Sequence, residues 1–99
     1  MIFAWFDARE CKKFGLELAE FYLERVVIDA KDKTTKFVEK KQKNLLAKIQ
    51  QKIYQFKTTT SLNVYKKAQI GNVFKWRLIE AGFDKRYVDE LTSWLMLNF

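Results

Sequence analysis

The stretch KKQKNLLAKIQQKIYQFK, residues 40–57, combines six lysines with regularly spaced apolar side chains and contains no acidic residue. The apolar residues recur at spacings of three and four, so on a helix they fall within a sector of about 100°. They are Leu45, Leu46, Ile49, Ile53 and Phe56. This pattern predicts an amphipathic helix over about residues 35–57, with one face buried and the lysines on the remaining surface.

A first helix is predicted over about residues 7–28. Asp7 and Glu10 have the spacing of a capping box, in which each side chain binds the backbone amide of the other residue. Phe6 and Cys11 are placed to form the accompanying hydrophobic staple. The apolar residues that follow also recur at spacings of three and four, which predicts a buried stripe. That stripe comprises Cys11, Phe14, Leu18, Phe21 and Tyr22.

Two shorter helices are predicted over about residues 62–81 and 85–97. The TTTS segment, residues 58–61, interrupts the preceding pattern and offers caps for the third helix. Gly82 suits the left-handed position after a helix, and Asp84 can cap the fourth helix. The inward residues of this last helix are predicted to be Val88, Leu91 and Leu95.

The composition agrees with a helical chain. Hydrophobic residues make up 48% of the 99 residues, proline is absent, and glycine occurs three times, so turn residues are too scarce for a sandwich or barrel. We therefore predict one all-α domain over residues 1–99, with a four-helix bundle-like fold.

Small residues suggest where two helices approach each other. Gly15 lies in a stripe of alanine, cysteine and glycine on the first helix, and Ala68 and Gly71 offer a matching patch on the third. We predict that the first and third helices cross there. Tyr65 and Trp76 share a face with Ala68, and we assign that face to the core.

The chain lacks the features of a secreted or membrane-spanning protein. Cys11 is the single cysteine, so no internal disulfide is expected, and the apolar opening MIFAWF is too short for a signal core. No stretch reaches the roughly 20 apolar residues of a spanning helix. A soluble, cytoplasmic protein that is not an integral membrane protein is the expectation.

Catalysis is not expected. The chain has no histidine, which removes the commonest general base and metal ligand, and Cys11 is interpreted as a buried structural thiol. Glu17, Glu20 and Glu24 are interpreted as a solvated acidic face. The three glycines are isolated, so they form no phosphate-binding loop. We expect no enzyme activity, no cofactor and no metal.

Positive charge is concentrated in the middle of the chain. Residues 30–67 carry eleven lysines against Asp32 and Glu39, a net charge of +9, whereas the whole chain carries +7. On the predicted second helix these lysines extend over about 35 Å. This asymmetry predicts a surface for an anionic partner. Its candidate residues are Lys36, Lys40, Lys41, Lys43, Lys48 and Lys52.

The residue types favour an acidic protein over nucleic acid as that partner. Only four of the nineteen basic residues are arginine, whose planar fork is preferred for reading bases. The acidic partner of the lysine surface could also be the stripe of Glu17, Glu20 and Glu24, in the same or another subunit. Sequence-tolerant nucleic-acid binding is the alternative. A membrane-surface helix is a third option, but the core requires its apolar face.

Both ends of the chain are apolar, with MIFAWF at the start and WLMLNF at the finish. Exposed apolar ends would favour aggregation, so they must be covered within the monomer or by a second chain. We predict a homodimer joined through them. The candidate residues are Phe3, Trp5, Phe6, Trp94, Met96 and Phe99. The predicted function is that of a small, non-enzymatic helical interaction module.

Overall fold

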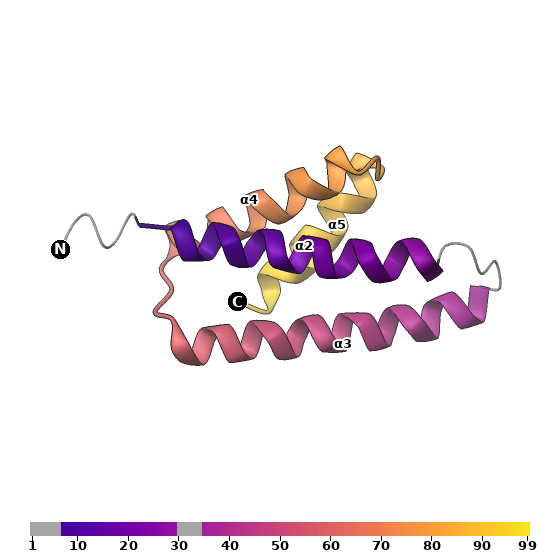
Figure 1. Cartoon of the computed structure of the whole chain (residues 1–99), viewed down its shortest axis with the longest axis horizontal. Coiled ribbons are helices and arrows are strands. Elements are labelled where there is room, and N and C mark those ends of the chain that lie inside the picture. Colours follow the sequence, from indigo (N-terminus) through magenta and orange to yellow (C-terminus); the bar gives the residue numbers. More distant parts are fainter. Residues whose placement is uncertain (1–6, 30–34) are drawn as a thin grey trace.

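A central helix, α2, packs against two others in the computed structural model, with α3 along one side and α4 along another (Figure 1). The structure describes residues 7–29 and 35–99, and it describes side chains within 7–26 and 43–99. Its helices are α2 (Arg9–Asp29), α3 (Thr35–Thr59), α4 (Val64–Glu80) and α5 (Lys85–Leu97). The described residues contain no strand, and the expected all-α, four-helix fold is confirmed.

The chain direction reverses twice before the last helix. α3 runs back along α2, and α4 then runs in the same direction as α2 on its other side (Figure 1). α5 folds back against α4. The chain end is also joined to α3, because Gln50 Nε2 donates to Asn98 Oδ1 at 3.0 Å and Lys57 Nζ donates to the Asn98 carbonyl at 3.3 Å.

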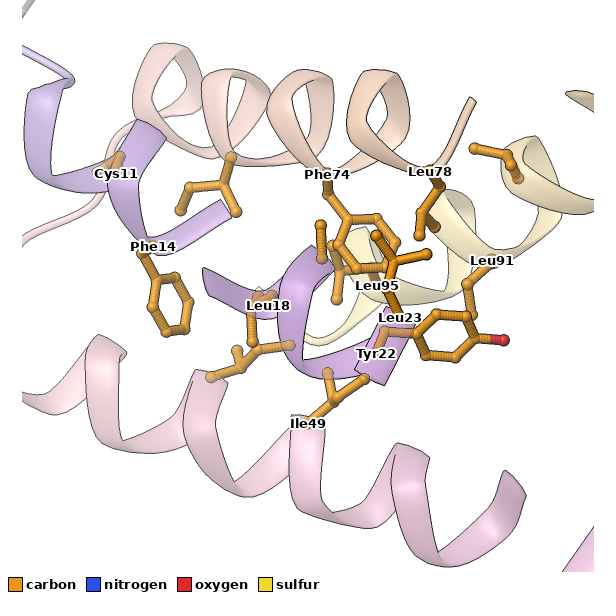
Figure 2. Close-up of a cluster of buried hydrophobic side chains, with 14 of the residues drawn as sticks. Cys11, Phe14, Leu18, Tyr22, Leu23, Ile49, Phe74, Leu78, Leu91 and Leu95 are labelled. Atoms are coloured by element: carbon orange, nitrogen blue, oxygen red, sulfur yellow. The ribbon is translucent and has the colours of Figure 1, made fainter. Parts of the chain in front are cut away.

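The core draws one apolar face from each helix. Leu18 of α2, Ile49 of α3 and Phe74 of α4 are fully buried and point into the same interior (Figure 2). Tyr22 is also fully buried, and its hydroxyl hydrogen-bonds to that of Tyr87. Most of the predicted inward residues of three helices are buried: Cys11, Phe14, Leu18 and Tyr22 in α2, Leu45, Ile49 and Ile53 in α3, and Val88, Leu91 and Leu95 in α5. Phe21, Leu46 and Phe56, which were also predicted to face inward, are only half-buried against the core.

The core face predicted for the third helix was wrong at Trp76 and Ala68, although Tyr65 is half-buried against the core. Trp76 is 58% exposed and Ala68 is also exposed. α4 instead buries Ile70, Phe74 and Leu78, which are spaced by four. Trp76 is two residues from Phe74, a rotation of about 200° around the helix, so its side chain lies on the opposite surface.

The backbones of α2 and α4 lie close together at Gly15. A Cβ atom on Gly15 would lie 2.7 Å from the carbonyl oxygen of Ile70, so only glycine fits without movement of the backbone. The predicted crossing of the first and third helices is therefore confirmed at Gly15. The small patch predicted to face Gly15 was wrong. Gly15 lies against Ile70 and Val73, whereas Gly71 faces the Met96 sulfur on α5.

The connection between α4 and α5 forms as expected. Gly82 has a φ of 96°, in the left-handed region, and its amide donates to the Ile79 carbonyl at 3.0 Å. The amide of Phe83 donates to the Leu78 carbonyl, which completes a Schellman motif. Asp84 then caps α5, because its side chain accepts from the Tyr87 amide at 3.3 Å.

Two other helix ends differ from the prediction. Asp7 accepts hydrogen bonds from the amide and the guanidinium of Arg9 rather than from the Glu10 amide, and the predicted staple involves Phe6, outside the described residues. Thr58 and Thr59 extend α3 rather than capping the next helix, because their hydroxyls donate to carbonyls of its last turn. Asn63 is the residue that caps α4.

Substituting Gly15 tests the close approach of α2 and α4. Alanine favours a helix over glycine by about 1 kcal/mol, but the added methyl group would overlap the Ile70 carbonyl. We expect Gly15→Ala to lower the free energy of unfolding by about 1–3 kcal/mol in chemical denaturation. Gly71→Ala is the matched control, because its methyl group meets only the flexible Met96 side chain. Equal stability of both variants would contradict this packing.

Candidate functional site

The predicted lysine surface lies on one continuous helix. All six candidate positions are within α3, and the side chains of Lys43, Lys48 and Lys52 are exposed. The side chains of Lys36, Lys40 and Lys41 lie outside the described set. Lys48 and Lys52 are one turn apart on the flank nearest α2, whereas Lys43 lies on a different side of the helix.

Lys48 and Lys52 line a groove between α2 and α3. The groove has a volume of about 340 Å³. Its lining residues are Phe21, Arg25, Lys48, Gln51, Lys52 and Gln55. They provide three cations, two carboxamides and one aromatic ring, with no carboxylate among them. We call this hollow the basic groove.

The ring of Phe21 holds two of the three cations together. The guanidinium carbon of Arg25 lies 3.7 Å from the ring centroid, and the Lys52 ammonium nitrogen lies 4.6 Å from it. Arg25 also donates to the carbonyl oxygen of Phe21 at 3.4 Å. These cation–π contacts attract both charges to the same ring, although like charges repel each other.

A second hollow continues from the basic groove along the seam between α2 and α3. Its volume is about 320 Å³, and it shares Lys52 and Gln55 with the basic groove. At its base the rings of Phe14 and Phe56 stack with centroids 4.0 Å apart. The seam therefore offers a cationic hollow beside one with an aromatic base, and Glu17 lines only the second.

The acidic stripe of α2 is partly occupied by other contacts. Arg77 Nε donates to Glu20 Oε1, and Glu24 lies 3.6 Å from the Arg25 guanidinium. Glu17 is exposed. Within residues 7–26 and 43–99, no ion pair joins this stripe to a lysine of α3. In this part of the chain, the lysines do not serve to neutralise the acidic stripe of the same subunit.

The cysteine thiol of the described residues is free and shielded. Cys11 is only 2% exposed, and burial raises the pKa of its thiol, so the nucleophilic thiolate is disfavoured. No cluster of three or more cysteine, aspartate or glutamate side chains suited to a metal ion occurs in the described part of the chain.

Three of the six self-association candidates contribute to packing within the monomer. The ring of Phe99 packs edge-on against Phe14, with centroids 6.3 Å apart. Met96 fills the space above Gly71, and Trp94 is half-buried against the core. Phe3, Trp5 and Phe6 lie outside the described residues.

Sequence reasoning missed part of the basic groove. Phe21 was assigned to the core, but it is half-buried and carries the cations, and Arg25, Gln51 and Gln55 were not selected. The spacing of four between Phe21 and Arg25 was an available signal, because such residues are neighbours on a helix. Phe21 and Arg25 come close to Lys48 and Lys52 only because α2 packs beside α3.

Comparison with known protein families, curated proteins and solved structures finds no significant match to this chain. Among the described helices, none combines the length and the apolar character needed to cross a membrane.

The state of Cys11 can be tested by thiol labelling. We expect the native thiol to react with a disulfide reagent at pH 8 at least about 100-fold more slowly than in guanidinium-unfolded protein, because burial shields it and raises its pKa. Equal rates in the native and unfolded protein would show an accessible thiol and contradict its structural role.

Proposed function

We propose that this chain is a small, non-enzymatic helical interaction module that binds an acidic segment of another protein in the basic groove. The observation that carries this proposal is the convergence of Arg25, Lys48 and Lys52 on a hollow whose lining lacks a carboxylate. Carboxylates bind such cations through charge-assisted hydrogen bonds, and Gln51 and Gln55 supply further neutral donors.

The adjoining hollow favours a peptide that carries both acidic and apolar side chains. An acidic residue in the basic groove would have its chain neighbour next to the stacked rings of Phe14 and Phe56. An apolar side chain bound there would gain free energy by leaving water. We therefore propose that the preferred segment alternates acidic and apolar residues.

The wider setting is also a proposal. We propose that the module works in the cytoplasm, in keeping with its single buried cysteine, and that it forms a homodimer. The dimer doubles the number of basic grooves available to one partner, which would raise avidity without a new contact.

Sequence-tolerant nucleic-acid binding is the second candidate. It is favoured by Tyr54, which is 68% exposed on α3 and lies on the same side of the helix as Lys43 and Lys57. A base can stack on an exposed aromatic ring while neighbouring lysines contact phosphates. The 25 residues of α3 would follow a backbone over about 37 Å.

Charge neutralisation in the basic groove tests the first candidate. The groove variant combines Arg25→Gln, Lys48→Gln and Lys52→Gln. Its matched control combines Lys13→Gln, Lys85→Gln and Arg86→Gln, three exposed cations whose loss changes the net charge equally. We expect the groove variant to bind a fluorescent peptide of alternating glutamate and leucine at least about tenfold more weakly, as measured by anisotropy. The control should bind like the wild type, and equal losses in both variants would contradict a groove-specific site.

A labelled oligothymidylate separates the two candidates. If nucleic acid is the ligand, Tyr54→Ala with Lys43→Gln should weaken oligothymidylate binding and reduce its salt dependence between 50 and 200 mM. The same pair should leave peptide binding unchanged if the basic groove is the site. Tight oligothymidylate binding that requires Tyr54, together with no peptide binding, would overturn the first candidate in favour of the second.

A further inference from the structure

A second groove lies on the other flank of α2, between α2 and α4. Its volume is about 400 Å³. Its lining residues are Lys12, Leu16, Gln69, Asn72, Val73, Trp76, Arg77 and Glu80. Leu16 is 43% exposed and Trp76 is 58% exposed, so two large apolar side chains from different helices meet at one open surface. We call this hollow the tryptophan groove.

The exposure of Trp76 sets this groove apart from the core. The other tryptophan with a described side chain, Trp94, is half-buried against the core. Burying a tryptophan side chain is favourable, and tryptophan is enriched among the residues that dominate interfaces. An exposed Trp76 beside Leu16 thus has the character of a docking residue.

The charges at the ends of this groove are opposite. α2 and α4 run in the same direction (Figure 1), with Gly15 beside Ile70 and Glu20 bonded to Arg77. Lys12 precedes Gly15 and therefore lies near the start of α4, whereas Glu80 is the last residue of α4. Gln69 and Glu80 are eleven positions apart on α4, so the groove extends about 16 Å along the helix. The groove has Lys12 at one end and Glu80 at the other, with Leu16, Val73 and Trp76 between them. Gln69, Asn72 and Arg77 also line it, and the guanidinium of Arg77 is bonded to Glu20.

We infer that the occupant of the tryptophan groove is a second copy of this chain, docked antiparallel about a two-fold axis near Val73 and Trp76. A two-fold interface requires a surface that is complementary to itself after a half-turn. The half-turn sets Lys12 of each copy opposite Glu80 of the other and brings together the Leu16 and Trp76 side chains of both copies. This inference rests on the proposed homodimer and assigns its surface to the tryptophan groove in place of the apolar chain ends predicted from the sequence.

The position of the lysines is compatible with this interface. Leu16 and Phe21 are five residues apart on α2, about 140° around the helix, so the tryptophan groove and the basic groove open on opposite flanks. Two copies joined at the first groove would keep their α3 lysines apart and both basic grooves open. An acidic partner in the tryptophan groove, by contrast, would meet the carboxylate of Glu80.

Sedimentation equilibrium of the full chain over about 1–200 μM tests this interface, because a small interface of this kind is expected to have a micromolar dissociation constant. Trp76→Ala should raise the dissociation constant at least about 30-fold. The side chain is exposed in the monomer, so the melting temperature measured at a low, monomeric concentration should change little.

Charge reversal gives a second and more specific test. Lys12→Glu alone should weaken the dimer at least about tenfold, because it places two acids opposite each other at both ends of the interface. Glu80→Lys alone should do the same with two cations. The double variant restores opposite charges and should dimerise within about threefold of the wild type. Lys13→Glu is the charge-matched control and should leave dimerisation unchanged.

The possible failures are distinguishable. A wild-type chain that stays monomeric to about 200 μM would overturn both the proposed homodimer and this interface. A dimer that tolerates Trp76→Ala and both single charge reversals would overturn the interface while leaving the homodimer in place. Neither outcome affects the proposal for the basic groove, which is measured by peptide binding.

Discussion

The close approach of α2 to α4 at Gly15 is the constraint on which the rest of the structure depends. With no side chain on Gly15, the backbone of α2 rests against Ile70, and Leu18 and Tyr22 are buried beside Phe74. This contact makes α2 the central helix, with α3 on its remaining side. The two flanks of α2 that stay open are the two grooves, so their spacing and orientation follow from the same packing.

The two grooves differ in chemistry because α2 meets a different helix on each flank. Toward α3 it meets lysines and glutamines, and Phe21 gathers cations around a single ring. Toward α4 it meets Val73 and Trp76, which create an apolar surface with opposite charges at its ends. We propose that the first groove binds an acidic segment and the second a copy of the same chain. A dimer would then carry two acidic-partner sites.

Sequence patterns within single helices predicted the fold well. The site was predicted less well, because it depends on contacts between helices. The periodicity of Leu45, Ile49 and Ile53 and the cap at Asp84 act within one helix, so they can be read directly from the sequence. Trp76 was assigned to the core because it shares a helix face with Tyr65 and Ala68, but the face that α4 buries is that of Ile70, Phe74 and Leu78. The basic groove requires knowing that α2 lies beside α3, which no local pattern contains. The lysine pattern therefore identified α3 as part of the site but could not identify Arg25 on α2.

Backbone amide shifts in a nuclear magnetic resonance titration test the central claim, that this chain binds an acidic segment between α2 and α3, most directly. Labelled protein would be titrated with a peptide of alternating glutamate and leucine at near-physiological salt. The largest shift changes should fall on Phe21, Arg25, Lys48 and Lys52, with small changes along α5. Changes that are absent, or that spread evenly over exposed lysines throughout the chain, would contradict a built anionic-partner site.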